Sequence, residues 1–383
     1  MNPLYIDSQR VGLGVEGYSL YVKDLKTGKF IEKFAPRSIP YDSILIQRPN
    51  GFISFAALSW LAAHNVSLTI LNWRGNVLQQ FVPEEPLNPQ LKIAQVLAHQ
   101  NVERHLLIAR RLVETKLERQ REFLSSLAKH YPEVKLPKIA PVNCSSTNTI
   151  RDSEALYASF YFAEYGKVVE SLGFDFKGRA GSWRSNTRNM HAADITNGLL
   201  NYSFALLKTY VRRAINAVGL ENTIPFLHEL RRTGSLTFDI MELWRTNCEY
   251  AVIQTLEKLK TEAKKKKKEK THFLTDGYEV MLESSSVKIL FDKFKLNVSM
   301  EEILTNCRIF AQFLLKGNKR NLSFMLKPVH VKPLFERKSV EHIILTRYAS
   351  ELKMNKSTLW YQKRRLQETG SLRIYNKTKQ FFV

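Results

Sequence analysis

Cysteine is scarce in this chain of 383 residues, which has only Cys144, Cys248 and Cys307. No two of them form a Cys-x-x-Cys pair and their number is odd, which argues against a zinc ribbon and a disulfide framework. No run approaches the roughly 18 apolar residues of a membrane-spanning helix, and the basic and apolar regions of a signal peptide are missing at the N-terminus. We therefore expect a cytoplasmic protein without a membrane partner.

Acidic residues are also few, 36 against 58 Lys and Arg, which gives a net charge of +22. The excess is uneven: residues 1–90 carry +1, residues 91–263 carry +6 and residues 264–383 carry +15. A charge imbalance on the scale of a domain indicates a polyanionic partner rather than a merely soluble surface. With a membrane surface disfavoured, we predict that the partner is a nucleic acid, and the tail described below favours double-stranded DNA.

Length and hydrophobic pattern predict an α+β, multidomain protein. Short β-rich runs dominate residues 1–85, around one buried helix over residues 52–64, and Pro83, Pro86 and Pro89 mark a linker. Beyond residue 90, apolar residues recur every three or four positions, which predicts helices. These helices are expected over 91–127, 151–171, 194–219, 222–232 and 239–263. The predicted domains are a β-rich N-terminal domain (1–85), a larger all-α catalytic domain (90–330) and a basic tail (335–383).

The tail has the layout of a helix-turn-helix over residues 347–375. A short helix is followed by a turn at Met354-Asn355, a second helix that Ser357 or Thr358 can cap, and a stop at Gly370. The second helix carries side chains that reach phosphates and base edges, and the predicted DNA contacts are Lys356, Lys363, Arg364 and Arg365. A helical hairpin with a solvated basic face is the alternative. The tail alone does not separate a transcription regulator from an enzyme.

Candidate chemistry lies in the middle of the chain. His228 closes an apolar run, and Asp239 and Glu242 follow three residues apart, so on a helix they share one face. Ser235 or Thr237 is the expected N-cap of that helix. A histidine and two carboxylates can bind a divalent ion such as Mg²⁺ or Mn²⁺, although a core histidine and ordinary helix-dipole acids explain the same pattern. Glu154, near the start of a long helix, is the candidate third ligand, whereas Glu164 and Glu170 on that helix are expected to be solvated.

At these residues the sequence resembles the CRISPR-associated Cas-one integrases. The resemblance rests on weak motifs that occur in the family's order over roughly residues 4–260. They are Glu154 in DSEALYASFYF, then DITNGLLNY from Asp194 to Tyr202, PFLH from Pro225 to His228, and SLTFDIMELWR from Ser235 to Arg245. The family's proline after Asp194 is missing, Thr196 is unusual and Pro225 stands where glycine is frequent. None of these departures touches a proposed ligand.

The resemblance implies a metal-dependent DNA endonuclease and integrase that inserts short DNA segments by transesterification of a terminal 3′-hydroxyl. It implies that Glu154, His228 and Glu242 bind Mg²⁺ or Mn²⁺, with Asp239 as an additional or supporting catalytic carboxylate. Near these ligands, Arg231, Arg232 and Arg245 are the candidate phosphate contacts. The expected assembly is a homodimer formed through the N-terminal domain, with a Cas-two partner in CRISPR adaptation. The tail is reminiscent of the casposon integrases, which use the same chemistry; a non-catalytic DNA-binding regulator is the alternative of another class.

Overall fold

The structure is a computed structural model of the chain. It describes residues 3–6, 8, 10–47, 50–72, 77–83, 88–138, 141–179, 192–230, 234–265, 272–275, 279–316 and 321–331. Its contacts separate a unit of Met1–Val331 from a unit of Lys332–Val383, and the helix-turn-helix expected in the second unit lies outside the described residues. Among the helices that are described, none combines the length and the apolar character needed to cross a membrane.

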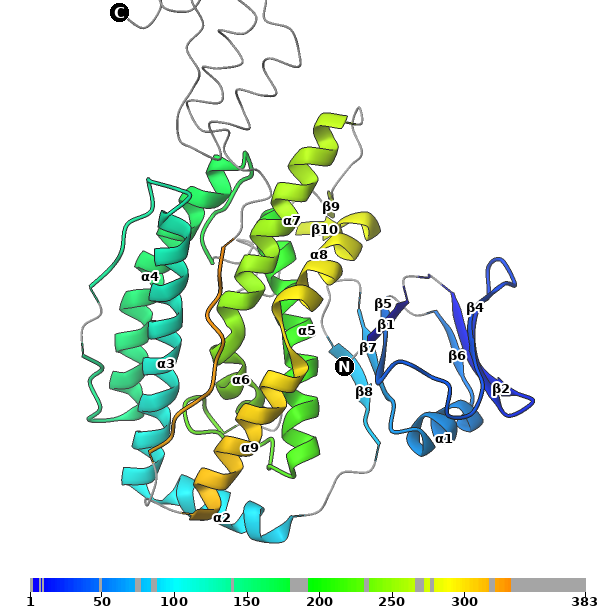
Figure 1. Ribbon diagram of the computed structural model, residues 1–383, viewed down its shortest axis with the longest axis horizontal. Helices are drawn as coiled ribbons and strands as arrows, with labels where there is room; N and C mark the ends of the chain where they lie inside the picture. The colour runs from blue at the N-terminus through cyan, green and yellow to red at the C-terminus, as the bar shows by residue number, and fades with distance from the viewer. Residues whose placement is uncertain are drawn as a thin grey trace, which may run out of the picture. The chain divides into compact units, whose positions relative to one another are not determined.

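Two four-stranded sheets and one helix form the N-terminal part, as the β-rich pattern predicted (Figure 1). One sheet has the order β1-β5-β7-β8 and the other β4-β3-β2-β6. The strands are β1 Pro3–Ile6, β2 Val11–Glu16, β3 Ser19–Asp24, β4 Phe30–Phe34, β5 Ser43–Gln47, β6 Gly51–Ile53, β7 Ser67–Leu71 and β8 Val77–Phe81. The helix α1, Phe55–Ala63, begins at Ser54, whose side chain accepts a hydrogen bond from Ala57 N. Apolar side chains of both sheets and α1 share one core.

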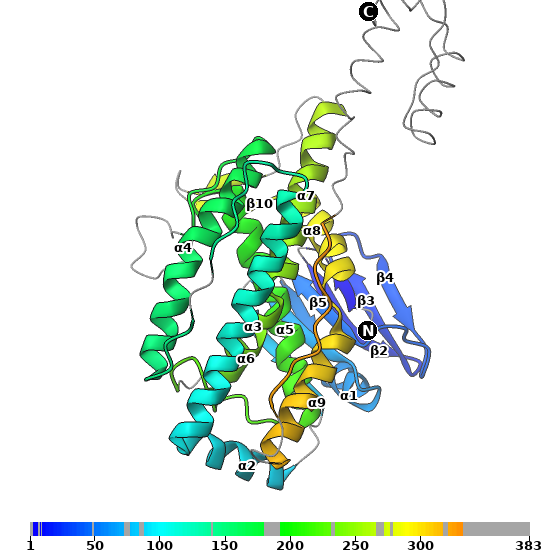
Figure 2. The same cartoon turned by 60° about the vertical axis from the view of Figure 1, so that its left-hand side comes forward.

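Long helices make up the second part, with α5 at their centre (Figures 1 and 2). Most α5 side chains are buried, because α6, α7, α8 and α9 all pack on it. The helices are α2 Pro89–Gln100, α3 Val102–Ala128, α4 Thr147–Ser171, α5 Ile195–Val218, α6 Ser235–Met241, η1 Glu242–Trp244, α7 Arg245–Lys265, α8 Ser284–Asn297 and α9 Met300–Lys316. The expectation of an all-α domain was wrong in one respect: β9 His272–Thr275 and β10 Glu279–Leu282 pair as an antiparallel hairpin.

Three predicted helices differ from the observed ones. The helix expected over 91–127 breaks at Asn101, which ends α2 and caps α3 with its side chain. No helix forms in the described part of 222–232; residues 221–230 are turns and bends, and partners outside the segment bind its backbone groups. The helix expected from residue 239 begins at Ser235 and passes through the short η1 turn before α7.

Strand β5 joins the two cores because its side chains alternate between its faces. Ile44 and Ile46 lie in the core of the β-rich part, whereas Leu45 belongs to the core of the helical part. Two further contacts tie the parts together: the rings of Tyr5 and Phe291 lie 4.8 Å apart, and Arg213 Nη1 lies 2.9 Å from Asp42 Oδ1. The β-rich part therefore rests on the helical part through both apolar and charged contacts.

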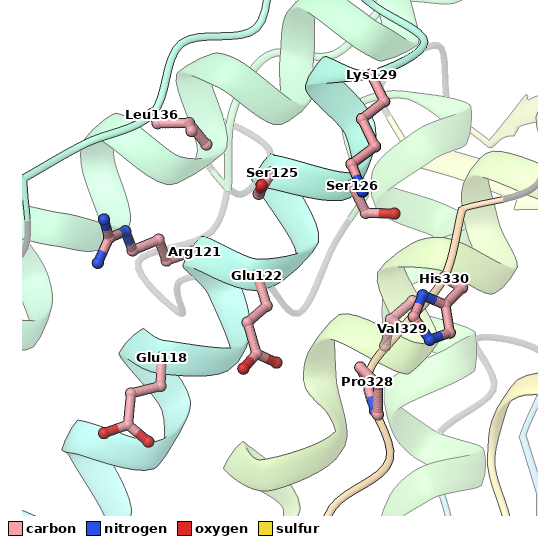
Figure 3. A pocket seen from close by; sticks show the side chains of 10 residues that line it. All are labelled: Glu118, Arg121, Glu122, Ser125, Ser126, Lys129, Leu136, Pro328, Val329 and His330. Carbon is pink, nitrogen blue, oxygen red and sulfur yellow. The ribbon is translucent and has the colours of Figure 1, made fainter.

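An extended segment, residues 321–331, follows α9 in the sequence and lies along α3 and α9 (Figure 2). Asn306 on α9 exchanges two hydrogen bonds with the backbone of Met325, and Ser126 on α3 accepts one from Val331 N. A pocket of about 460 Å³ lies between this segment and α3 (Figure 3). Its α3 residues fall on the face of the helix opposite the buried Lys116, so the pocket is separate from the site described next.

Candidate functional site

Two of the predicted ligands, Glu154 and Glu242, meet at a single lysine. Lys116, in the middle of α3, places its ammonium against Glu154 Oε1 of α4 and 2.6 Å from Glu242 Oε2 of η1. The Lys116 and Glu242 side chains are 7% and 3% exposed, and that of Glu154 is 23% exposed. Three elements far apart in the sequence thus bring two carboxylates and one cation into a largely buried cluster.

Glu242 is ionised in this cluster. Burial opposes its charge, but Arg245 and Lys116 outweigh burial and lower the pKa of Glu242 to about 2. Arg245, the first residue of α7, places Nη2 2.7 Å from the other oxygen of Glu242, Oε1. In return, the neighbouring carboxylates raise the pKa of Lys116 despite its burial. The cluster is therefore a set of fixed charges, two negative and two positive.

Asp239 holds the loop that carries His228. Its fully buried carboxylate accepts hydrogen bonds from the backbone N–H groups of Phe226, Leu227 and His228, and lies 2.7 Å from His228 Nδ1. Because all four of these contacts occupy the Asp239 carboxylate, Asp239 is suited to hold His228 in place rather than to bind a ligand of its own. A histidine held through Nδ1 presents Nε2 as the nitrogen that can bind a metal.

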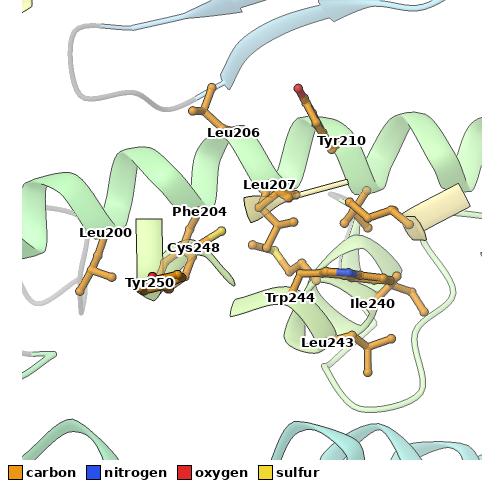
Figure 4. Close-up of a cluster of buried hydrophobic side chains, with 14 of the residues drawn as sticks. Leu200, Phe204, Leu206, Leu207, Tyr210, Ile240, Leu243, Trp244, Cys248 and Tyr250 are labelled. Atoms are coloured by element: carbon orange, nitrogen blue, oxygen red, sulfur yellow. The ribbon is translucent and has the colours of Figure 1, made fainter. Parts of the chain in front are cut away.

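A buried apolar layer fixes the short helix that bears Asp239 and Glu242. Ile240, Leu243 and Trp244 are buried in the core of the helical part, which also contains Leu207 and Tyr210 of α5 (Figure 4). The expected N-cap at Ser235 or Thr237 was wrong: Gly234 caps α6 with φ +56°, a left-handed conformation that suits glycine.

Helix α2 binds the backbone of the residues that precede His228, from Glu221 to Pro225. Gln95, which is fully buried, donates to the carbonyls of Glu221 and Ile224 at 2.9 Å each and accepts from Glu221 N at 2.8 Å. One turn along, His99 Nδ1 lies 2.6 Å from the carbonyl of Pro225. The loop is therefore anchored by α2 before His228 and by Asp239 at His228 itself.

Gln95→Leu should loosen this loop without touching the charged cluster. Leucine leaves two partly buried carbonyls and one N–H without their partner, and each unsatisfied group costs up to about 1–3 kcal/mol. We expect the free energy of unfolding, measured by urea denaturation, to fall by about 2 kcal/mol or more. Gln100→Leu, on the exposed side of the same helix, is the matched control and should change it by less than about 0.5 kcal/mol. Equal stability of the two variants would contradict the anchoring role.

Not every predicted residue lies in the described part of the chain. Arg245 is in the cluster, but Arg231, Arg232, Lys356, Lys363, Arg364 and Arg365 lie outside the described residues. The expectation that Glu164 is solvated was wrong, since its side chain is 5% exposed, lies 2.5 Å from Lys167 Nζ and accepts from Lys135 N. Glu170 is exposed, as expected.

The residue that sequence analysis missed is Lys116. A signal was present, because α3 buries Leu112 and Val113 on the same side as Lys116 and Gln120. A lysine in phase with the apolar face of an amphipathic helix must be buried, and a buried lysine needs a charged partner. Nothing in the local pattern identifies that partner.

The donor set suits a divalent cation in its chemistry. Two carboxylates already gather one cation, and a carboxylate-held imidazole lies on the adjacent loop, which is the pattern of ligands and supporting groups at many metal sites. Across the described ranges, however, no three His, Cys, Asp or Glu side chains lie close enough together to hold a metal ion. The structure pairs Glu154 with Glu242 and His228 with Asp239.

Comparison with known sequences identifies one family. The family model described as CRISPR associated protein Cas1 (the Cas-one family) matches residues 4–295. CRISPR-associated protein Cas1 3 of Methanobrevibacter ruminantium is 27% identical over 214 residues, 51% of this chain and 61% of that protein. CRISPR-associated endonuclease Cas1 1 of Francisella tularensis subsp. novicida is 24% identical over 285 residues, 70% of this chain and 81% of that protein. The first of these alignments thus spans less than two thirds of the relative.

Solved structures agree with this result. A casposase bound to an integration product is 26% identical, with a TM-score of 0.75, and the match covers 91% of this chain and 100% of that one. A Cas1 protein from Thermotoga maritima shares the fold, with a TM-score of 0.65 at 19% identity over 85% of this chain and 100% of that one. Because the family model covers well over half of the sequence, including Glu154, His228, Asp239 and Glu242, the chain belongs to the CRISPR-associated Cas1 family.

Proposed function

We propose that this protein is a metal-dependent DNA endonuclease and integrase that joins a DNA 3′-hydroxyl to a target strand. The observation that carries the proposal is the convergence of Glu154 and Glu242 on one cation, beside a histidine that Asp239 holds by Nδ1. Membership of the Cas1 family supports nuclease or integrase activity, since relatives are described as endonucleases.

In this proposal Glu154, His228 and Glu242 hold Mg²⁺ or Mn²⁺, and Asp239 keeps His228 oriented. When bound, the ion would polarise the scissile phosphate and lower the pKa of the attacking hydroxyl or water. A DNA-end hydroxyl as the nucleophile gives strand transfer, and water gives cleavage. Arg245, held beside Glu242, supplies positive charge where phosphate oxygens become more negative in the transition state; Arg231 and Arg232 are proposed to contact phosphates nearby.

Two biological settings fit the same chemistry. The resemblance to a casposase bound to an integration product supports integration of a mobile element, and the basic tail (335–383) is consistent with that setting. Solved neighbours also include a Cas6-RT-Cas1–Cas2 complex, which supports a Cas2 partner if the protein serves CRISPR adaptation. We further propose a homodimer formed by the β-rich domain (1–85), where Tyr18 and Phe55 expose 84% and 89% of their surface.

The enzymatic proposal is tested with the full-length protein, a labelled duplex bearing a free 3′-hydroxyl, and a supercoiled target plasmid. Joined product should form in Mg²⁺ or Mn²⁺ and be absent in EDTA. A duplex with a blocked 3′ end is the control for nucleophile identity and should yield no joined product. Failure to join or to cut DNA in the presence of either metal would sink the proposal.

The tail separates an integrase from a regulator. Replacing Lys356, Lys363, Arg364 and Arg365 together by alanine should weaken DNA binding and reduce the dependence of log Kd on log salt, by a slope of up to about 0.9 for each phosphate that is no longer neutralised. An integrase should still join strands when DNA is in excess, because its chemistry lies in the other unit. The measurements are fluorescence anisotropy across a salt series and the joining assay. A DNA affinity unchanged from that of the unmodified protein would refute the tail's role.

A further inference from the structure

Lys116 takes no part in the proposed reaction, yet its ammonium lies between two of the proposed metal ligands. A cation between Glu154 and Glu242 is already part of the fold, supplied by α3. Burying a carboxylate is costly unless it is paired, and two carboxylates that share a site repel each other. The ammonium therefore lets α4 and η1 bring their carboxylates together without any bound ion.

The oxygens that contact Lys116, Glu154 Oε1 and Glu242 Oε2, are ones that a metal bridging the two glutamates would use. Mg²⁺ and similar hard cations bind carboxylate oxygens at about 2.0–2.1 Å, so a metal that bridges Glu154 and Glu242 would take the place of the ammonium, which lies 2.6 Å from Glu242 Oε2. The second oxygen of Glu242 is no alternative, because Arg245 Nη2 lies 2.7 Å from it. The ammonium and a metal ion are thus mutually exclusive occupants of the space between the two glutamates.

The charges lead to the same conclusion. Glu154, Glu242, Lys116 and Arg245 together are neutral, so a divalent ion added to all four would create an excess of two positive charges in a largely buried place. Without the Lys116 charge the set carries −1, and a divalent ion would leave only +1. Removing the lysine charge should therefore favour metal binding.

We propose that Lys116 is an internal counter-cation that occupies the metal position and that a metal ion displaces on binding. It keeps Glu154 and Glu242 together in the metal-free protein, and it weakens the apparent affinity for the metal. The inference rests on the proposed function, since it takes Glu154 and Glu242 as metal ligands.

The test compares full-length wild type with Lys116→Met, which keeps an unbranched side chain of similar length, one atom shorter, without the charge. Mn²⁺ binding is measured by isothermal titration calorimetry, and thermal unfolding is followed in EDTA and in excess Mn²⁺. We expect Lys116→Met to bind Mn²⁺ about tenfold more tightly or better. Its Tm should be lower than that of the wild type in EDTA, and it should rise more on addition of Mn²⁺ because a ligand stabilises the state that binds it.

Lys167→Met is the matched control, because it also removes a lysine that lies 2.5 Å from a buried glutamate, Glu164. It should lower the Tm in EDTA while leaving the Mn²⁺ affinity unchanged. Lys116→Arg, which keeps a cation, should bind Mn²⁺ no more tightly than the wild type. If Lys116→Met is unfolded in EDTA, excess Mn²⁺ should restore its folding transition.

Three results would overturn the inference: Mn²⁺ affinity of Lys116→Met equal to or weaker than that of the wild type, an equal gain in affinity in Lys167→Met, or no recovery of an unfolded Lys116→Met in Mn²⁺. A wild type that binds Mn²⁺ in any of these cases leaves the proposed metal site intact. If instead no variant and no wild type binds Mn²⁺, the metal site itself fails, and the two ideas are distinguished.

Discussion

His228→Ala should lower both strand joining and DNA cleavage by about 100-fold or more. A catalytic metal contributes several kcal/mol to stabilising the transition state, and each 1.4 kcal/mol lost is a factor of ten in rate. The fold should tolerate the change, because the histidine side chain is 39% exposed and Asp239 keeps its three backbone donors. We expect the free energy of unfolding to change by only about 1 kcal/mol.

The measurement is the initial rate of joined product at several Mn²⁺ concentrations, alongside urea denaturation. His330→Ala is the matched control: this histidine is exposed, lies in the pocket beside α3 and should leave both rates unchanged. A joining rate of His228→Ala within about threefold of the wild type would show that the histidine is not a ligand. Loss of activity together with a fall in the free energy of unfolding well beyond about 1 kcal/mol would indicate a structural role instead.

Asp239→Ala should be the most destabilising substitution in the site. It leaves the backbone N–H groups of Phe226, Leu227 and His228 without an acceptor, in a place where the side chain that bound them has no solvent exposure. Each buried unsatisfied donor costs about 1–3 kcal/mol, so we expect a loss of about 3 kcal/mol or more. The cost is below a simple sum because the loop relaxes around the missing carboxylate.

Asp239→Asn tests whether Asp239 orients the His228 ring, separately from its contribution to the stability of the fold. Its amide oxygen can still accept from part of the loop, but its NH₂ group cannot accept from His228 Nδ1. Such supporting substitutions lower metal affinity or activity by about 10–100-fold, which calorimetry with Mn²⁺ and the joining assay both measure. Asp152→Ala, an exposed acid on α4, is the control and should change stability by less than about 0.5 kcal/mol. If Asp239→Ala unfolds at the wild-type urea concentration, the supporting role is wrong.

The α+β architecture and the long helices could be read from the sequence because they depend on local pattern. Short β-rich runs predicted strands in the N-terminal part, and three- and four-residue spacing predicted helices in the regions of α3, α4, α5 and α7. Asp239 and Glu242 could be grouped because they are three residues apart on one short helical stretch. In each case the interaction that matters lies within one or two turns of the chain.

Residues 221–230 show where local pattern fails. Their apolar residues resemble a helix face, yet the backbone takes its hydrogen bonds from Gln95 on α2 and Asp239 on α6. Those partners lie outside the segment, and a helical conformation would have used the same backbone groups internally. A tertiary contact therefore overrode the local preference.

By itself, the sequence determined the order of the elements and the neighbourhood of His228, Asp239 and Glu242, because hydrogen bonding and amphipathic spacing act over a few residues. Only the tertiary structure decided which charges meet. Lys116 reaches Glu154 across 38 residues of chain, and Glu242 on η1 lies farther still along the sequence, so no periodicity specifies these partners. The pairing follows from the packing of α3 against α4 and η1, since that packing places both carboxylates at the buried ammonium.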